Sequence, residues 1–101
     1  MAPDSVARAH ILVMGRVQGV GFRAFAMKTA VGHGLRGGVR NLSDGRVEVD
    51  VEGDKASIET FLGALRAGPP LGRVDHMDIR WDRSNAGYAG FEIWFDAGPH
   101  R

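Results

Sequence analysis

The sequence predicts an α+β sandwich in which an antiparallel β-sheet carries two helices on one face. The first observation is the order of the predicted elements, which runs strand, helix, hairpin, helix and strand, with a short fifth strand after them. The second is the hairpin, whose apolar and charged side chains alternate as in a sheet that is covered on one face only. This βαββαβ order is that of the ferredoxin-like folds.

The chain has 101 residues, which suffices for one core and leaves no room for a second. We therefore expect a single domain over residues 1–101. Its ends, residues 1–5 and 97–101, carry little apolar pattern and are expected to fray.

The first strand is predicted over residues 8–14, because a short apolar run there ends at a glycine-rich segment. A helix is predicted from Arg23 to about His33, with Gly32 and Gly34 at its end. The apolar face of this helix would consist of Phe25, Ala26, Thr29 and Ala30.

Residues 36–42 and 46–52 are predicted to form a hairpin around the turn-forming residues 43–45. Its second strand alternates three valines with Glu48, Asp50 and Glu52, so the sequence predicts a solvent-exposed acidic face. Arg40 should point to the opposite strand face from Asn41 and is expected to be a solvated charge.

The second helix is predicted over Asp54–Arg66, with Asp54 as N-cap and apolar residues at positions 58, 61, 62 and 65. Alternation around Met77, Ile79 and Trp81 predicts a fourth strand. Phe91, Ile93 and Phe95 predict the short fifth strand, and residues 83–90 join the two.

Composition excludes several classes of function. The 13 Lys and Arg nearly balance the 12 Asp and Glu, so no broad basic face for nucleic acid is expected, and the strands lack the paired aromatics of an RNA-binding sheet. The absence of cysteine removes disulfides, thiolate zinc sites and a cysteine nucleophile. No apolar run is long enough for a signal peptide or a membrane span, so a cytoplasmic protein is expected. The four histidines lack metal-ligand spacing and receive no role.

The segment GRVQGVGFR, residues 15–23, lies between the first strand and the first helix. Glycines there let successive backbone N–H groups converge on an anion at the positive end of the helix. The sequence therefore predicts a phosphate-binding loop, with Arg23 adding charge-assisted bonds to the same anion. The predicted loop consists of Gly15, Arg16, Val17, Gln18, Gly19, Val20, Gly21 and Phe22, of which residues 17–22 would supply the amides.

Three alternatives compete for this loop. It could be a plain glycine-rich turn with Arg23 in solvent. The residues Gly19, Gly21 and Ala24 match a dinucleotide fingerprint, but that site needs a parallel crossover and a larger sheet. A Walker loop would need Gly-Lys-Ser/Thr, which does not occur.

Together with GGVRNLSDGRVEV and VEG, the segment GRVQGVGFR resembles the acylphosphatase family, from roughly Val6 to Phe95. The resemblance implies hydrolysis of acyl phosphates without a metal or cofactor, with Arg23 as the substrate-binding arginine and Asn41 as the residue that positions the water. Two positions depart from the family pattern. Gly38 and Ala24 stand where many members carry an aromatic residue.

This chemistry needs few residues, because a carboxylate leaving group requires little general-acid help. Asn41 can orient a water but cannot act as a strong base at neutral pH. Without the resemblance, the sequence favours a structural role for Asn41 at a turn or strand end. The expected partners are a small acyl phosphate and inorganic phosphate, as product and inhibitor, and the expected state is a monomer.

Two further hypotheses share the same fold. One is a non-catalytic module that binds phosphate or another anion. The other is the first domain of a larger carbamoyl-transferring maturation protein. We expect this to be the less favoured hypothesis, because the chain ends at Arg101 with no cysteine-rich continuation.

Overall fold

The computed structural model describes residues 6–83 and 86–95, so the predicted fraying of residues 1–5 and 97–101 lies outside the described residues. The elements follow the predicted order. They are β1 Val6–Arg16, α1 Phe22–Gly32, β2 Arg36–Asn41, β3 Val47–Asp54, α2 Lys55–Ala67, β4 Arg73–Asp82 and β5 Phe91–Ile93. Neither helix in this part of the chain has the length and hydropathy needed to cross a bilayer.

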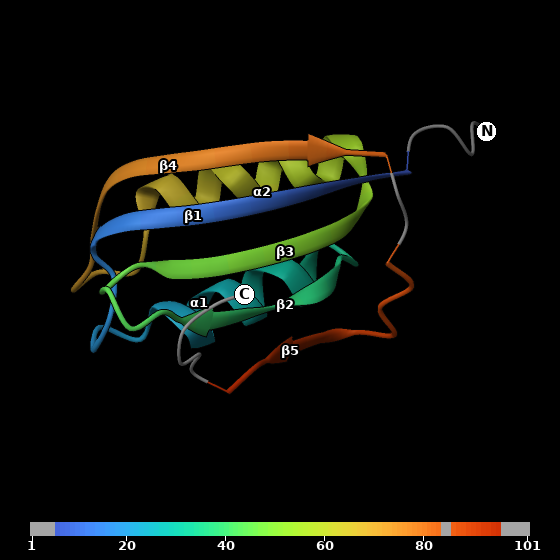
Figure 1. The fold of residues 1–101 in the computed structure, drawn as a ribbon. Coiled ribbons are helices and arrows are strands. Elements are labelled where there is room, and N and C mark those ends of the chain that lie inside the picture. The colour runs from blue at the N-terminus through green and yellow to red at the C-terminus, as the bar shows by residue number, and fades with distance from the viewer. Residues whose placement is uncertain (1–5, 84–85, 96–101) are drawn as a thin grey trace.

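The strands form one sheet in the order β4-β1-β3-β2-β5, and both helices cover the same face of it (Figure 1). The predicted α+β sandwich is confirmed. The first four strands pair antiparallel, whereas β5 pairs parallel with β2, so the complete sheet is mixed. This parallel edge arises because the chain leaves β4 at one edge of the sheet and returns beside β2 at the other.

The core lies between the sheet and the helices. Three helix-facing residues of β1 (Ala9, Ile11, Val13) and three of β3 (Val47, Val49, Val51) are 0% exposed. The side chains of α2 at the four predicted positions are also buried, with exposures of 7% or less. Asp54 caps α2 as predicted, because its carboxylate accepts a hydrogen bond from Ser57 N at 3.2 Å.

The acidic side chains of β3 are buried, so the prediction of a solvent-exposed face is wrong. Glu48, Asp50 and Glu52 are 4%, 8% and 0% exposed. Arg8 donates two hydrogen bonds to Asp50, at 2.9 and 2.8 Å. The oxygens of Glu52 accept from the backbone N–H groups of Ala86 and Tyr88, both at 2.8 Å.

The physical reason is that basic side chains flank β3 on both neighbouring strands. In the observed register, Arg8 of β1 and Arg36 of β2 both lie opposite Glu52, and His10 lies opposite Asp50. Charges on neighbouring strands of one sheet face come close enough to pair. Burial of the carboxylates is therefore accompanied by ion pairs and backbone hydrogen bonds, as the desolvation of a charge requires.

Arg40 is likewise a structural ion-pair partner and not the solvated charge that was expected. Its Nε donates to Glu48 at 2.7 Å, and only 26% of its side chain is exposed. The second oxygen of Glu48 lies 2.7 Å from His10 Nε2. The expectation that Arg40 points away from the face of Asn41 is consistent with this geometry, since Glu48 lies opposite Arg40 on the open face.

Replacing the fully buried Glu52 should destabilise the fold. In Glu52→Gln, one carboxylate oxygen becomes an NH2 group that faces a backbone N–H, and the charge partner of Arg36 is lost. We expect a loss of about 2 kcal/mol in the free energy of unfolding, measured by urea denaturation. The control is Glu59→Gln on the exposed face of α2, expected to stay within about 0.5 kcal/mol. Equal effects of the two changes would contradict the structural role of Glu52.

Candidate active site

The loop between β1 and α1 begins at an irregularity in the sheet. The pairing of β1 with β4 shifts register between Met14 and Gly15. A Cβ atom on Gly15 would lie 2.2 Å from the carbonyl oxygen of Arg73, and its φ is +134°. Gly15 is therefore required by the close passage of β4, and this packing directs the chain out of the sheet into the loop.

Apolar anchors and left-handed glycines give the loop its shape. Val17 and Phe22 are buried in the core, at 1% and 2% exposure. Between them, Gly19 and Gly21 take φ values of +74° and +79°, and a Cβ at either would meet no atom within 4 Å. The loop thus keeps its side chains inward at its ends and bare backbone on its outer surface, as a nest of N–H groups requires.

The first turn of α1 carries no acidic residue, and Gly21 at the N-cap offers no side chain to its N–H groups. The first N–H groups of a helix have no acceptor in a preceding turn. Arg23 adds a positive charge at this end, which is already the positive end of the helix dipole. The local electrostatics therefore favour an anion at this place.

Gln18 joins the loop to the β2–β3 hairpin. Its Nε2 donates to the carbonyl oxygens of Leu42 and Arg46, at 2.8 and 2.9 Å. Because Leu42 directly follows Asn41, this contact fixes the end of β2 beside the loop. The sequence predicted Gln18 only as part of the cradle, and nothing in its pattern indicated the link to the hairpin.

Asn41 is the last residue of β2 and lies opposite Val47 of β3. It shares the helix-facing side of the sheet with Val39, and its Oδ1 atom is buried. Figure 1 shows the β2–β3 hairpin, the β1–α1 loop and the start of α1 at the same end of the sandwich. The fold therefore brings the segments of the two predicted catalytic residues, Arg23 and Asn41, to one end of the molecule.

Arg23 is half-buried and lines a surface pocket of about 660 Å³. The other lining residues all come from the last described segment of the chain. They are Glu92, Ile93, Trp94 and Phe95. This contribution of the chain end to the surroundings of Arg23 was not predicted from the sequence.

Trp94 covers the glycine that departs from the family pattern. A Cβ atom on Gly38 would lie 2.1 Å from Cε2 of Trp94, so the indole fills the space that a side chain at position 38 would occupy. The backbone N–H of Trp94 donates to the carbonyl oxygen of Val39 at 2.8 Å, and the Arg40 guanidinium lies 6.0 Å from the centroid of the Trp94 ring. Packing beside the candidate site is thus supplied by an aromatic from another part of the chain.

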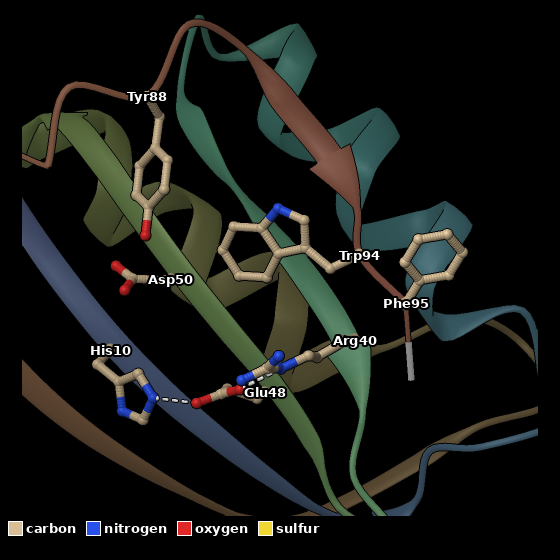
Figure 2. Close-up of a pocket in the computed structure, with 7 residues that line it drawn as sticks. All are labelled: His10, Arg40, Glu48, Asp50, Tyr88, Trp94 and Phe95. Atoms are coloured by element: carbon tan, nitrogen blue, oxygen red, sulfur yellow. Dashed lines mark hydrogen bonds and ion pairs between the residues drawn. The ribbon is translucent and has the colours of Figure 1, made fainter. Parts of the chain in front are cut away.

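A second surface pocket, of about 560 Å³, lies on the open face of the sheet (Figure 2). Trp94 borders both pockets. Figure 2 shows the Tyr88 hydroxyl directed towards Asp50, and Phe95 on the side of Trp94 away from Tyr88. The full lining of this second pocket is His10, Arg40, Glu48, Asp50, Tyr88, Trp94 and Phe95.

Burial raises the pKa of Tyr88 above its usual value, and the negative charge of Asp50 and a hydrogen bond to it act in the same direction. The ring centroids of Tyr88 and Trp94 lie 5.7 Å apart.

Over residues 6–83 and 86–95, no group of three or more His, Asp or Glu side chains is arranged to hold a metal ion.

Comparison with known proteins confirms the resemblance seen in the motifs. The family model Acylphosphatase matches residues 9–93. An acylphosphatase from Thermus thermophilus is 52% identical over 87 residues, which cover 86% of this chain and 98% of that protein.

Solved structures agree with these sequence matches. The crystal structure of acylphosphatase from Bacillus subtilis superposes with a TM-score of 0.86 and 39% identity, covering 87% of this chain and 98% of that one. Full-length HypF, crystallised in its phosphate- and nucleotide-bound form, also gives a TM-score of 0.86, at 31% identity. The match covers 92% of this chain and 12% of HypF.

The packing of Trp94 on Gly38 predicts strong coupling between the two positions. Gly38→Ala should lower the free energy of unfolding by about 2 kcal/mol, because the new methyl group displaces the indole. In a Trp94→Ala background the same change should cost much less, so a double-mutant cycle should give a coupling above about 1 kcal/mol. Gly63→Ala, in α2 where nothing lies within 4 Å, is the control and should be neutral or stabilising. Additive effects at positions 38 and 94 would argue against this contact.

Tyr88 is the only tyrosine of the chain, so the near-ultraviolet absorbance of its phenolate reports its ionisation alone. In the native protein we expect the midpoint above the reference pKa of 10.0, and in Asp50→Asn a lower midpoint than in the wild type. The unfolded chain then ionises first, so stability should begin to fall as the pH rises through 10.0. A native midpoint equal to that in urea would refute the burial of this phenol.

Proposed function

Because the chain belongs to the acylphosphatase family, we propose that it hydrolyses acyl phosphates to a carboxylate and inorganic phosphate. The observation that carries the proposal is the glycine loop at the N-terminus of α1, with Arg23 in the first turn. A cation at the positive end of a helix is unfavourable alone and becomes favourable when a dianionic phosphoryl group binds between them.

In the proposed mechanism the loop amides of residues 17–22 and the Arg23 guanidinium hold the three equatorial oxygens of the phosphoryl group. Hydrogen bonds to these oxygens are preorganised by the fold and strengthen as charge develops in the transition state. The buried anchors Val17 and Phe22 support this role, because they restrict the movement of the loop that carries the donors.

Asn41 is proposed to orient the attacking water. Its amide both donates and accepts hydrogen bonds, which suits positioning better than proton removal. The water oxygen bonds to phosphorus while the bond from phosphorus to the acyl oxygen breaks, and the carboxylate leaves with the electron pair. The proton of the water passes to the phosphoryl oxygen, so the products are a carboxylate and inorganic phosphate. The link from Gln18 to Leu42 supports this role, because it holds the neighbouring residue against the loop.

The proposal includes the surroundings in which the enzyme works. We infer that it acts as a monomer in the cytoplasm, that inorganic phosphate competes with substrate for the loop, and that no metal ion takes part. The family membership supports the small-molecule substrate. Sedimentation of the purified chain tests the monomeric state, and inhibition of turnover by inorganic phosphate tests the competition with substrate.

Arg23→Ala and Asn41→Ala should each abolish most of the activity on a simple aromatic acyl phosphate. We expect kcat to fall by about 100- to 1000-fold in each, the usual cost of losing one preorganised donor or positioning group. Turnover is measured with a chelator present, and Arg66→Ala, on an exposed position of α2, is the matched control.

Each result has a distinct meaning. Activity that survives chelation and is lost only in the two site variants supports the proposed enzyme. A folded wild type that binds phosphate without turnover would identify a binding module instead, and full activity in either site variant would remove that residue from the mechanism.

A further inference from the structure

The pocket beside Arg23 has a composition that phosphate binding does not explain. Arg23 is its cationic lining residue and Glu92 its carboxylate, while Ile93, Trp94 and Phe95 supply large apolar surface. A dianionic phosphoryl group needs donors and positive charge, whereas three consecutive apolar residues and an acid offer it neither.

We propose that this pocket receives the acyl group of the substrate and selects uncharged apolar acyl groups, aromatic ones above all, against acyl groups that carry a second carboxylate. The inference rests on the proposed function, because it takes the phosphoryl group to lie in the glycine loop. It names Trp94 and Phe95 as the apolar recognition surface and Glu92 as the residue that rejects negative charge.

The sheet register places this surface beside β2, the strand that carries Asn41. β5 runs parallel to β2, with Ile93 opposite Val39, and the backbone N–H of Trp94 donates to the carbonyl oxygen of Val39 at 2.8 Å. Asn41 follows two residues later on β2. Trp94 therefore continues alongside β2 towards its Asn41 end, and Arg23 forms another wall of the pocket that Trp94 and Phe95 line. An acyl phosphate held by Arg23 would place its carbonyl end against them.

The exposure of these side chains indicates a surface for apolar contact. Phe95 is 95% exposed and Ile93 is 41% exposed, although both are large and apolar. Adjacent exposed apolar groups in a concave site commonly mark a ligand-binding surface. The pocket volume of about 660 Å³ lies within the usual range for small-molecule sites and leaves room for a ring beside the phosphoryl group.

The charges of the pocket explain why acyl groups with a second carboxylate should be disfavoured. Once Arg23 is engaged by the phosphoryl group, the remaining charge among the described lining residues is that of Glu92. A second carboxylate on the acyl group would then approach a like charge and would also lose water against the aromatic rings. Because Glu92 is exposed, this repulsion should weaken as the salt concentration rises.

The test compares three substrates, acetyl phosphate, benzoyl phosphate and succinyl phosphate, in the wild type and in three variants. Phe95→Ser and Trp94→Leu should each lower the ratio of kcat/KM for benzoyl over acetyl phosphate by about tenfold, as expected for the loss of one apolar wall. Glu92→Gln should raise the ratio for succinyl over acetyl phosphate by about fivefold at low salt. The matched controls are Trp81→Leu and Glu59→Gln, since β4, which carries Trp81, lies at the opposite edge of the sheet.

The inhibition constant of inorganic phosphate distinguishes a loss of acyl-group recognition from structural damage to the loop. Phosphate occupies only the loop, so the substrate ratios should shift without a parallel shift in its inhibition constant. A variant that lowers turnover of all three substrates in proportion and weakens phosphate inhibition has damaged the loop, and that result would overturn the inference.

The outcomes also separate this inference from the proposed function. A wild type that hydrolyses none of the three substrates removes the proposed function, and the inference with it. A wild type that hydrolyses them, with ratios that do not change in Phe95→Ser, Trp94→Leu and Glu92→Gln, leaves the function in place and removes the inference alone.

Discussion

The neutralisation of the buried carboxylates on β3 is the constraint on which the rest of the structure depends. β3 pairs with both β1 and β2, and its acidic row needs cations from each of these strands. A slip of one residue would turn the carboxylates into the helix-facing core, whose described side chains are apolar. The observed register therefore fixes the direction of every side chain on β2. Arg40 is held on the open face by Glu48, and Asn41 consequently faces the loop side.

Much of this fold follows from local pattern. The apolar spacing of α2, the burial of the alternate valines of β3 and the position of the glycine segment between β1 and α1 each reflect a short-range rule, and the structure has all three. The burial of Glu48 and Glu52 was missed because alternation reports two faces without saying what covers the second one. A signal was present in the basic residues of the neighbouring strands, and it becomes readable only when the register is known.

In the candidate site, too, the residues close together in sequence were predicted, and those brought in by long-range contacts were not. Gly19, Gly21 and Arg23 are close in sequence, so motif and helix position sufficed to place them together. The contributions of Trp94 and Gln18 depend on contacts between segments far apart in the chain, and no period or motif encodes such contacts. Gly38 illustrates the point most clearly. In the sequence it is a missing aromatic, whereas in the structure it makes room for Trp94, the residue that follows β5.

The short parallel strand β5 has a consequence for how enzymes of this kind diversify. Residues that would hold the phosphoryl group lie near the start of the chain, and those that would meet the acyl group lie near its end. Glu92 and Ile93 of β5 are exposed at the edge of the sheet, so substitutions at these two positions disturb few neighbours. Selection can therefore alter the last described segment while the loop and its chemistry stay constant. Under the proposed assignment, substrate preference would then change almost independently of the rate of phosphoryl transfer.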